Sequence, residues 1–152
     1  ELSATLSIPV VMALPSSIAA LNIFAATRVL LMTPFDEPMN KLIREYLTHA
    51  GIEALSPRQT LRHYTDALAL HPEAIYELTQ KAFAAEKDLD AIYFQGAILN
   101  PLKILDRLET ELATTVVAST PGMVCRVLSQ LGLSCRIQGY GKLLAQWPRE
   151  SH

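Results

Sequence analysis

The chain has 152 residues, enough for one domain with a substantial core but too few for two ordinary domains. Half of the residues are hydrophobic and 18% are charged, a balance that excludes an extended disordered chain. The 13 basic and 15 acidic residues give a formal net charge of -2 without a long block of like charge, so the sequence predicts neither nucleic-acid binding nor attraction to an anionic membrane.

Two features of the sequence bear on the compartment. Cys125 and Cys135 are too few and too irregularly placed for a disulfide framework or a zinc site, so we expect two buried, inert thiols in a cytoplasmic protein. The apolar stretch over residues 8–26 contains Pro15 and Asn22 and lacks a basic amino-terminal region. We therefore interpret it as neither a signal peptide nor a membrane span.

The first third of the chain alternates between apolar runs and amphipathic stretches. Residues 8–12 predict a short buried strand, a helix is expected to open at residues 15–17, and residues 28–32 predict a second strand that ends in a turn at 33–36. The next helix is expected to begin at Asp36 or Glu37 and to end at Gly51. Its spacing places Met39, Leu42, Ile43, Tyr46 and Leu47 on the buried face, and Asn40, Lys41, Arg44 and Glu45 on the exposed face.

The middle of the chain is less regular. Residues 52–55 predict a weak strand, and residues 56–66 are polar and predict an irregular segment, a candidate mobile flap over a cleft. Another helix is expected from residue 71 to about residue 88. Its inner face is predicted to contain Ile75, Leu78, Ala82 and Phe83.

The stretch from Asp90 to Leu108 is the one around which the rest of the chain is organised. Residues 91–94 are apolar and have the length typical of a strand buried on both faces. Residues 95–97 then break the run, and Asn100 and Pro101 predict the N-cap and first residue of a helix. Because ligands bind at the carboxyl ends of strands in open parallel sheets, we expect a site first at residues 95–97.

The last third repeats the pattern of strand and helix. Residues 114–118 predict a strand, and residues 119–121 open a helix that runs through Val124, Val127, Leu128 and Leu131 and ends at Gly132. Trp147 is interpreted as a packing anchor for the tail. Strands that alternate with helices predict an α/β domain with an open parallel sheet flanked by helices on both faces. The turns lack the glycine-rich phosphate fingerprint of nucleotide-binding domains.

Several of these stretches, in this order, resemble the aspartate/glutamate racemase superfamily, most closely its arylmalonate decarboxylase and maleate cis-trans isomerase branch. The resemblance covers most of the chain and implies one lobe of a two-lobed racemase-like fold that works without metal or organic cofactor. The stretches that carry it are residues 8–11 leading into 17–26, residues 28–55, residues 90–108, TVVASTPGM at 115–123, and GYGKLL at 139–144.

The resemblance also implies a division of the chain. Residues 1–26 correspond to the last strand of the first lobe and its crossover helix, residues 27–136 to the second lobe, and residues 137–152 to a carboxyl-terminal segment that returns to the first lobe. The front of the first lobe has no counterpart. We therefore expect either a fragment or truncated form, or a partner chain that completes the cleft.

The family's chemistry depends on a cysteine thiolate at the end of a strand, which removes or delivers a proton next to a carboxylate or adds to a double bond. By resemblance, the second-lobe cysteine falls at Gly96, which offers an N–H group but neither a nucleophile nor a base. A family tyrosine that helps to hold the substrate carboxylate falls at Phe35, which lacks the hydroxyl. The catalytic residues of this chain therefore stay unknown.

What remains is a set of groups able to bind an anion at the strand ends. Helix amino termini near Glu37, Pro101 and Pro121 would direct partial positive charge at the same cleft. Several members have a structural alternative. Thr120 is more typical of a plain helix cap, and Thr33 and Ser119 fit either role. Gln95 favours a functional role, and Gly96 also fits a purely backbone requirement. The candidate substrate-binding residues are Thr33, Phe35, Gln95, Gly96, Ala97, Ser119 and Thr120.

His49, His63 and His71 have no spacing that suggests a metal site, so no metal is expected. His63 and Tyr64, in the candidate flap, stay on a longer list of site residues.

Two hypotheses of different classes follow. The first is a cofactor-independent racemase, isomerase or decarboxylase for a small carboxylic acid, whose only catalytic cysteine would come from the missing first lobe. The second is a catalytically inactive module that binds a carboxylate or only pairs with itself. A homodimer is expected in either case, since half of a two-lobed molecule leaves an edge and apolar surface to cover.

Overall fold

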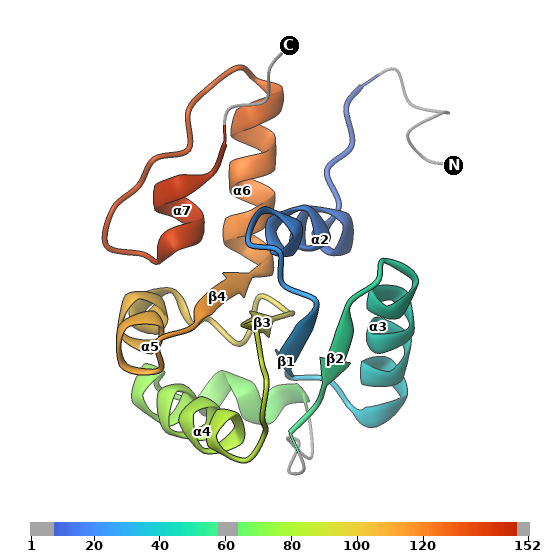
Figure 1. Ribbon diagram of the computed structural model, residues 1–152, viewed down its shortest axis with the longest axis vertical. Coiled ribbons are helices and arrows are strands. Elements are labelled where there is room, and N and C mark those ends of the chain that lie inside the picture. Colours follow the sequence, from blue (N-terminus) through green and yellow to red (C-terminus); the bar gives the residue numbers. More distant parts are fainter. Residues whose placement is uncertain (1–7, 58–63, 149–152) are drawn as a thin grey trace.

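The computed structural model describes residues 8–57 and 64–148, and these form an α/β domain around one parallel sheet (Figure 1). The strand order is β2-β1-β3-β4, with β1 at Arg28–Met32, β2 at Glu53–Leu55, β3 at Ala91–Phe94 and β4 at Thr115–Ala118. All three neighbouring pairs are parallel, and Leu30 lies opposite Leu55 on one side and Ile92 on the other. The predicted fold class is confirmed.

Helices cover both faces of the sheet (Figure 1). One face packs against α2 (Ala13–Ile23), α3 (Glu37–His49), α6 (Ser119–Gln130) and α7 (Lys142–Gln146). The other packs against the 3₁₀ segments η1 (Tyr64–Ala69) and η2 (Leu102–Ile104), and against α4 (Pro72–Ala84) and α5 (Leu105–Glu111). Because both faces are covered, β3 is buried along its whole length, with Tyr93 on the first face and Phe94 on the second.

The predicted strand at residues 8–12 is wrong. Met12 has an extended backbone, but residues 9–12 pair with no strand in the described part of the chain, and the side chains of Ile8 and Met12 are exposed. A strand requires a neighbour with which to exchange backbone hydrogen bonds, and the apolar composition of this run does not supply one. The helix that follows, α2, starts at Ala13, before the predicted Pro15.

The predicted helices exist, but their buried faces are rotated relative to the apolar stripes. On α3, Ile43 and Leu47 are buried as predicted, whereas Leu42 and Tyr46 are exposed and Asn40 is buried. A polar side chain can be buried in a helix when a local partner satisfies its hydrogen bond. Thr79 on α4 is an example, because its hydroxyl donates to the Ile75 carbonyl at 2.7 Å. Met39 on α3 and Leu78 on α4 were also predicted to face inward, and both are exposed.

The helix after β3 begins later than predicted. Asn100 Oδ1 accepts the N–H of Leu102 at 3.3 Å, but this opens the short segment η2, and α5 starts only at Leu105. Candidate flap residues 58–63, which include His63, lie outside the described residues. Residues 64–69 form η1.

Two carboxylates of α5 hold the carboxyl-terminal part of the chain. Asp106 accepts the N–H of Gly141 at 2.8 Å, and Glu109 accepts the N–H groups of Lys142 at 2.7 Å and Val116 at 2.9 Å. Burial raises the pKa of Glu109, and its two backbone donors oppose that shift. The segment that leads into α7 is therefore fixed to this lobe; its predicted return to a first lobe stays a prediction.

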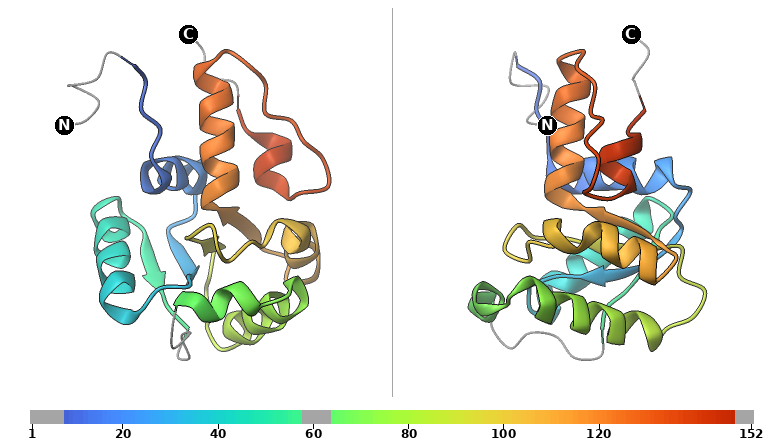
Figure 2. Two further views of the ribbon diagram at one scale, coloured as in Figure 1. Left: turned by 180° about the vertical axis from the view of Figure 1, so that it is seen from behind. Right: turned by 90° about the vertical axis from the view of Figure 1, so that its left-hand side faces the viewer.

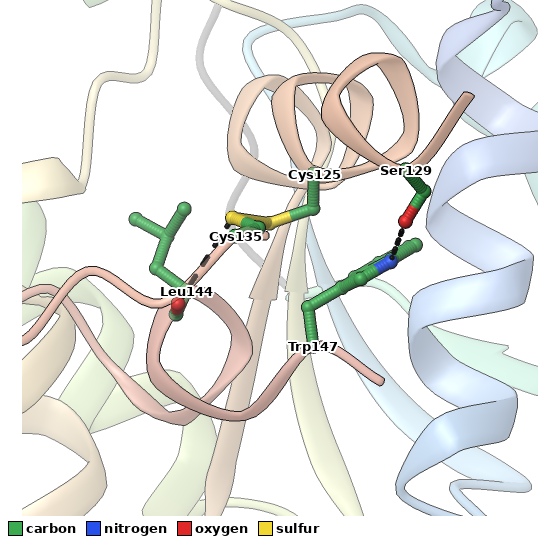
Figure 3. The surroundings of a disulfide bond; sticks show 5 residues. All are labelled: Cys125, Ser129, Cys135, Leu144 and Trp147. Atoms are coloured by element: carbon green, nitrogen blue, oxygen red, sulfur yellow. Dashed lines mark hydrogen bonds between the residues drawn. A yellow bond between two sulfur atoms is a disulfide. The ribbon is translucent and has the colours of Figure 1, made fainter. Parts of the chain in front are cut away.

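The prediction of two thiols is wrong, because Cys125 on α6 forms a disulfide with Cys135 (Figure 3). Their burial was predicted correctly. The chain turns at Gly132, and both views of Figure 2 show the next segment running back alongside α6, so the two Cα atoms lie 5.3 Å apart. Trp147 is buried and donates from Nε1 to Ser129 Oγ at 2.8 Å, which confirms it as an anchor.

Candidate functional site

The seven predicted site residues follow the carboxyl ends of three neighbouring strands, β1, β3 and β4, as parallel strands require. The structure separates them into two groups. Thr33, Phe35, Gln95 and Gly96 belong to the turns after β1 and β3, which we call the closed turns. Ala97, Ser119 and Thr120 line a cavity beside α6, which we call the open edge.

In the first closed turn, the polar groups bind one another. Thr33 donates its hydroxyl to Asn40 Oδ1 and accepts the N–H of Phe35 at 3.2 Å. Asn40 Nδ2 in turn donates to the Phe35 carbonyl at 3.0 Å, and Asp36 caps α3 by accepting the N–H of Met39. The Thr33 hydroxyl therefore has a structural role, and the buried Asn40, which sequence reasoning placed on the exposed face, is central to it.

Gly96 occupies a position that a larger residue does not fit. Its φ of +104° is a conformation that favours glycine. A Cβ atom there would lie 2.8 Å from Pro34 Cδ and 3.2 Å from Phe35 Cζ. The position that corresponds by resemblance to the family's second cysteine is thus closed by the turn after β1.

Gln95 has a partner that the sequence did not suggest. The hydroxyl of Tyr93 donates to Gln95 Oε1, and the Gln95 N–H donates to the Met32 carbonyl at 2.9 Å. Burial raises the pKa of Tyr93, with Ser17 on α2 opposing the shift, so the phenol stays protonated and serves as a donor. Gln95 is therefore a structural residue in this arrangement as well as a candidate ligand.

An aromatic pair lies over the first closed turn. The Tyr64 ring stacks on Phe35, with centroids 6.2 Å apart and planes 7° from parallel. Tyr64 is half exposed, and it is the one residue of the longer list that the described structure brings to the site. No spacing in the sequence signals this contact, because Tyr64 and Phe35 come from separate connections.

The open edge borders a cavity of about 370 Å³. Its walls are mostly apolar, and its polar groups come from Asn100, Ser119 and Thr120. None of the described residues that line it has an ionisable side chain. The lining residues are Phe94, Ala97, Asn100, Pro101, Leu102, Ala118, Ser119, Thr120, Pro121, Val124, Ile137 and Leu144. Sequence reasoning did not find the contributions of Ile137 and Leu144, because the segment that carries them reaches β4 only through the fold.

Helix α6 starts at this cavity without a side-chain cap. Its N-cap is Ala118, and Ser119 is the first helical residue, so the predicted capping by residues 119–121 is wrong. The N–H groups of Ser119 and Thr120 lie in the first turn and have no intrahelical acceptor, while Pro121 has no N–H. The positive end of the helix dipole therefore lies at the open edge.

The described structure offers no thiolate, because both cysteines of the sequence are bonded to each other. Within the described ranges, no group of three or more His, Cys, Asp and Glu side chains is placed to hold a metal ion. A search of the same residues finds no helix with the length and apolar character needed to cross a bilayer.

A family model described as arylmalonate decarboxylase matches residues 1–144. The chain belongs to the arylmalonate decarboxylase family. A curated relative, the maleate isomerase of Alcaligenes faecalis, is 24% identical over 140 residues, which are 91% of this chain and 54% of that protein. The chain therefore spans about half the length of this family member.

Two solved structures support the same assignment of the fold. A cysteine-to-alanine variant of the maleate isomerase Iso from Pseudomonas putida S16, solved with maleate, matches with a TM-score of 0.83 and 22% identity, over 97% of this chain and 59% of that chain. A cysteine variant of arylmalonate decarboxylase in its liganded form matches with a TM-score of 0.81 and 20% identity, over 93% and 61%. The fold is thus that of the maleate isomerase and arylmalonate decarboxylase branch of the superfamily.

Proposed function

We propose that this chain is a carboxylate-binding lobe for the cofactor-independent isomerase or decarboxylase chemistry of its family, with a small carboxylic acid as ligand. The observation that carries the proposal is the open edge, where α6 begins without a side-chain cap beside a cavity. Backbone N–H groups at such a helix start bind anions, and the same groups stabilise the charge that develops on a carboxylate during proton transfer at its α-carbon.

The names of the relatives support this ligand class. One family member is named a maleate isomerase, and its homologue in Pseudomonas putida S16 was solved with maleate. Maleate is a small carboxylic acid, and N–H and hydroxyl groups such as those at the open edge bind a carboxylate. In this proposal, the three candidate residues of the open edge contact the acid, namely Ala97, Ser119 and Thr120. The four residues of the closed turns set the shape of the cleft, namely Thr33, Phe35, Gln95 and Gly96.

The reaction itself requires a thiolate that this chain does not provide. Its two cysteines are joined in a disulfide, and Gly96 has no room for a side chain. In the proposed function, the thiolate is supplied by a second polypeptide segment that completes the cleft, such as a first lobe. The chain contributes carboxylate binding and orientation.

The test is carboxylate binding and turnover by the protein expressed from its native gene. Titration calorimetry with maleate, malonate and phenylacetate measures binding, and proton NMR in D₂O measures isomerisation, α-hydrogen exchange and decarboxylation. We expect saturable binding of at least one acid, with turnover only when a cysteine-bearing segment is present. Absence of binding to every acid would refute the proposal.

A second candidate function is a binding or dimerising module without catalysis. The packing of Pro34 and Phe35 over Gly96 favours it, since the space for a second thiolate is filled. Under this alternative the native product is a homodimer of this chain that binds an acid without turnover. Light scattering and intact-mass spectrometry distinguish the two: a product with an upstream cysteine supports the enzyme, and a dimer of the 152-residue chain supports the module.

A further inference from the structure

We propose that the cavity between α6 and the carboxyl-terminal segment binds the apolar body of a monocarboxylic acid, whose carboxylate contacts the Ser119 hydroxyl and the first N–H groups of α6. This inference rests on the proposed function and specifies its ligand: an acid with one carboxylate and a compact apolar group.

The shape and lining of the cavity indicate the apolar part of the ligand. About 370 Å³ is enough for a single ring with a short side chain. Phe94 and Leu102 form part of the wall from the β3 side, and Val124 on α6 and Leu144 on α7 complete it. An apolar group enclosed by these side chains is transferred from water to an apolar environment, and this transfer is favourable. The cavity should therefore bind an acid with an apolar group more tightly than a polar acid of similar size.

Ser119 indicates the polar part. Only 4% of the Ser119 residue is exposed, and its hydroxyl has no hydrogen-bond partner among the described residues. In the described part of the chain, Arg28 Nε is the only fully buried polar side-chain atom without a hydrogen-bond partner. Because the Ser119 hydroxyl also lacks a partner, its oxygen must be reachable from the cavity. Because Ser119 lines the cavity, its hydroxyl is available to donate a hydrogen bond to a ligand there.

The charge balance indicates one carboxylate. Among the described residues, no Lys, Arg, His, Asp or Glu lines the cavity. The positive potential there comes from the start of α6, equivalent to about half an elementary charge. That potential, with the two N–H groups and the Ser119 hydroxyl, suits a single carboxylate. A second carboxylate would have to lie against the apolar walls, where its desolvation opposes binding.

The outer wall is held firmly enough to form a defined site. Ile137 donates its N–H to the Leu144 carbonyl at 2.8 Å, which joins the two lining residues of the carboxyl-terminal segment. Cys135, two residues before Ile137, is bonded to Cys125, the residue next to Val124 (Figure 3). The segment and α6 are thus linked covalently beside the cavity.

The test compares ligands and matched variants of the whole chain by titration calorimetry. The ligands are phenylacetate, its neutral analogue phenylacetamide, and maleate. Val124→Phe fills the cavity, and Val127→Phe is its control, because Val127 lies on the same helix with nearly the same exposure, 41% against 43%, and does not line the cavity. Ser119→Ala removes the hydroxyl, and Ala97→Leu is a second filling variant should Val124→Phe fail to fold.

We expect phenylacetate to bind at least tenfold tighter than either phenylacetamide or maleate. Val124→Phe should weaken phenylacetate binding at least tenfold, Val127→Phe less than twofold, and Ser119→Ala about fivefold. Equal effects of the two valine variants, or binding of maleate as tight as that of phenylacetate, would overturn the inference and leave the proposed function standing. Failure of all acids to bind would overturn both.

Discussion

The turn after β1 and the start of α6 after β4 each place a hydroxyl residue directly after a buried strand, but the two hydroxyl groups have opposite surroundings. The Thr33 hydroxyl donates a hydrogen bond to Asn40 Oδ1 and accepts one from the Phe35 N–H, so both partners lie within the turn and the start of α3. Ser119 is more deeply buried than Thr33, but it has no hydrogen-bond partner among the described residues, and it lines a cavity. The comparison teaches that the position of a polar residue at a strand end does not decide its availability; its partners do.

The same contrast applies to the glycine beside the closed turn and the cavity beside the open edge. At Gly96 the space for a side chain is filled by Pro34 and Phe35, whereas at Ser119 the space is left empty. From this contrast we expect the closed turns to stabilise the fold and the open edge to bind the ligand.

The largest expected effect is the loss of the disulfide that holds the wall of the open edge. The free energy of unfolding of the Cys125→Ser/Cys135→Ser variant should be about 2–4 kcal/mol lower than that of the wild type, because the unfolded chain regains the conformational freedom that the crosslink removes. Urea unfolding with and without a phosphine reductant measures this. The reductant should destabilise the wild type and leave the variant unchanged; a wild type that is insensitive to reductant, with the thiols shown free, would contradict the account.

The next effect concerns the crowded position in the closed turns. Gly96→Ala should cost about 1–3 kcal/mol more than Gly132→Ala, because both glycines have positive φ but only Gly96 would place a Cβ against Pro34. Urea unfolding of the two variants gives the difference directly. Equal losses would mean that the turn after β1 moves aside and that a side chain, including a cysteine, fits at position 96.

A third variant removes the buried amide that organises the first closed turn. Asn40→Ala should lower the free energy of unfolding by about 1–3 kcal/mol, since the Thr33 hydroxyl and the Phe35 carbonyl each lose a buried partner. Thermal unfolding measures the loss, and phenylacetate binding should stay within twofold of wild type. A variant with normal stability but impaired binding would reverse the assigned roles of the two turns.

A fourth prediction uses a group remote from both turns. Three donors, Thr27 N–H, Arg28 N–H and the Thr27 hydroxyl, lower the pKa of Asp90 at the amino-terminal end of β3. The folded pKa lies below the unfolded value of about 3.9, so the stabilisation is present above that pH and is lost as pH falls through the folded pKa. Melting temperatures from pH 6 to pH 2 should therefore fall less steeply for Asp90→Asn than for wild type; equal slopes would contradict this.

The smallest expected effect on stability comes from the open edge. Ser119→Ala should change the free energy of unfolding by less than about 0.5 kcal/mol, because the hydroxyl has no protein partner to lose. Urea unfolding tests this alongside Thr33→Ala, which should be clearly destabilised. A loss of more than about 1 kcal/mol on Ser119→Ala would show that the hydroxyl stabilises the fold.

Continuous apolar runs made β1, β3 and β4 predictable from the sequence, because strands buried on both faces need little else. Residues 8–12 have the same character but form no strand, since pairing depends on a neighbour that composition does not specify. The buried face of α3 was predicted wrongly for a related reason. Asn40 is buried because its Oδ1 accepts a hydrogen bond from the hydroxyl of Thr33, seven residues earlier, and the apolar spacing does not indicate this contact.

The candidate site was predictable in position but not in detail. Parallel strands fix which turns share an edge, so all seven residues were placed correctly at strand ends, while their ligand roles stay predictions. The stacking of Tyr64 on Phe35 and the walls at Ile137 and Leu144 come from segments distant in sequence. The Tyr93–Gln95 hydrogen bond is local, but it depends on the side-chain conformations of two residues that the apolar pattern does not specify. The Cys125–Cys135 bond was missed because spacing alone does not reveal that the chain turns back at Gly132.

The most direct measurement is a titration of the ¹⁵N-labelled protein with phenylacetate, followed by two-dimensional NMR. The account predicts saturable shifts of the Ser119 and Thr120 amide signals, with the amide signals of Phe35, Gln95 and Gly96 nearly unchanged. Shifts concentrated at Gly96 and Phe35, with Ser119 and Thr120 unmoved, would contradict the claim that the open edge, and not the closed turns, binds the acid.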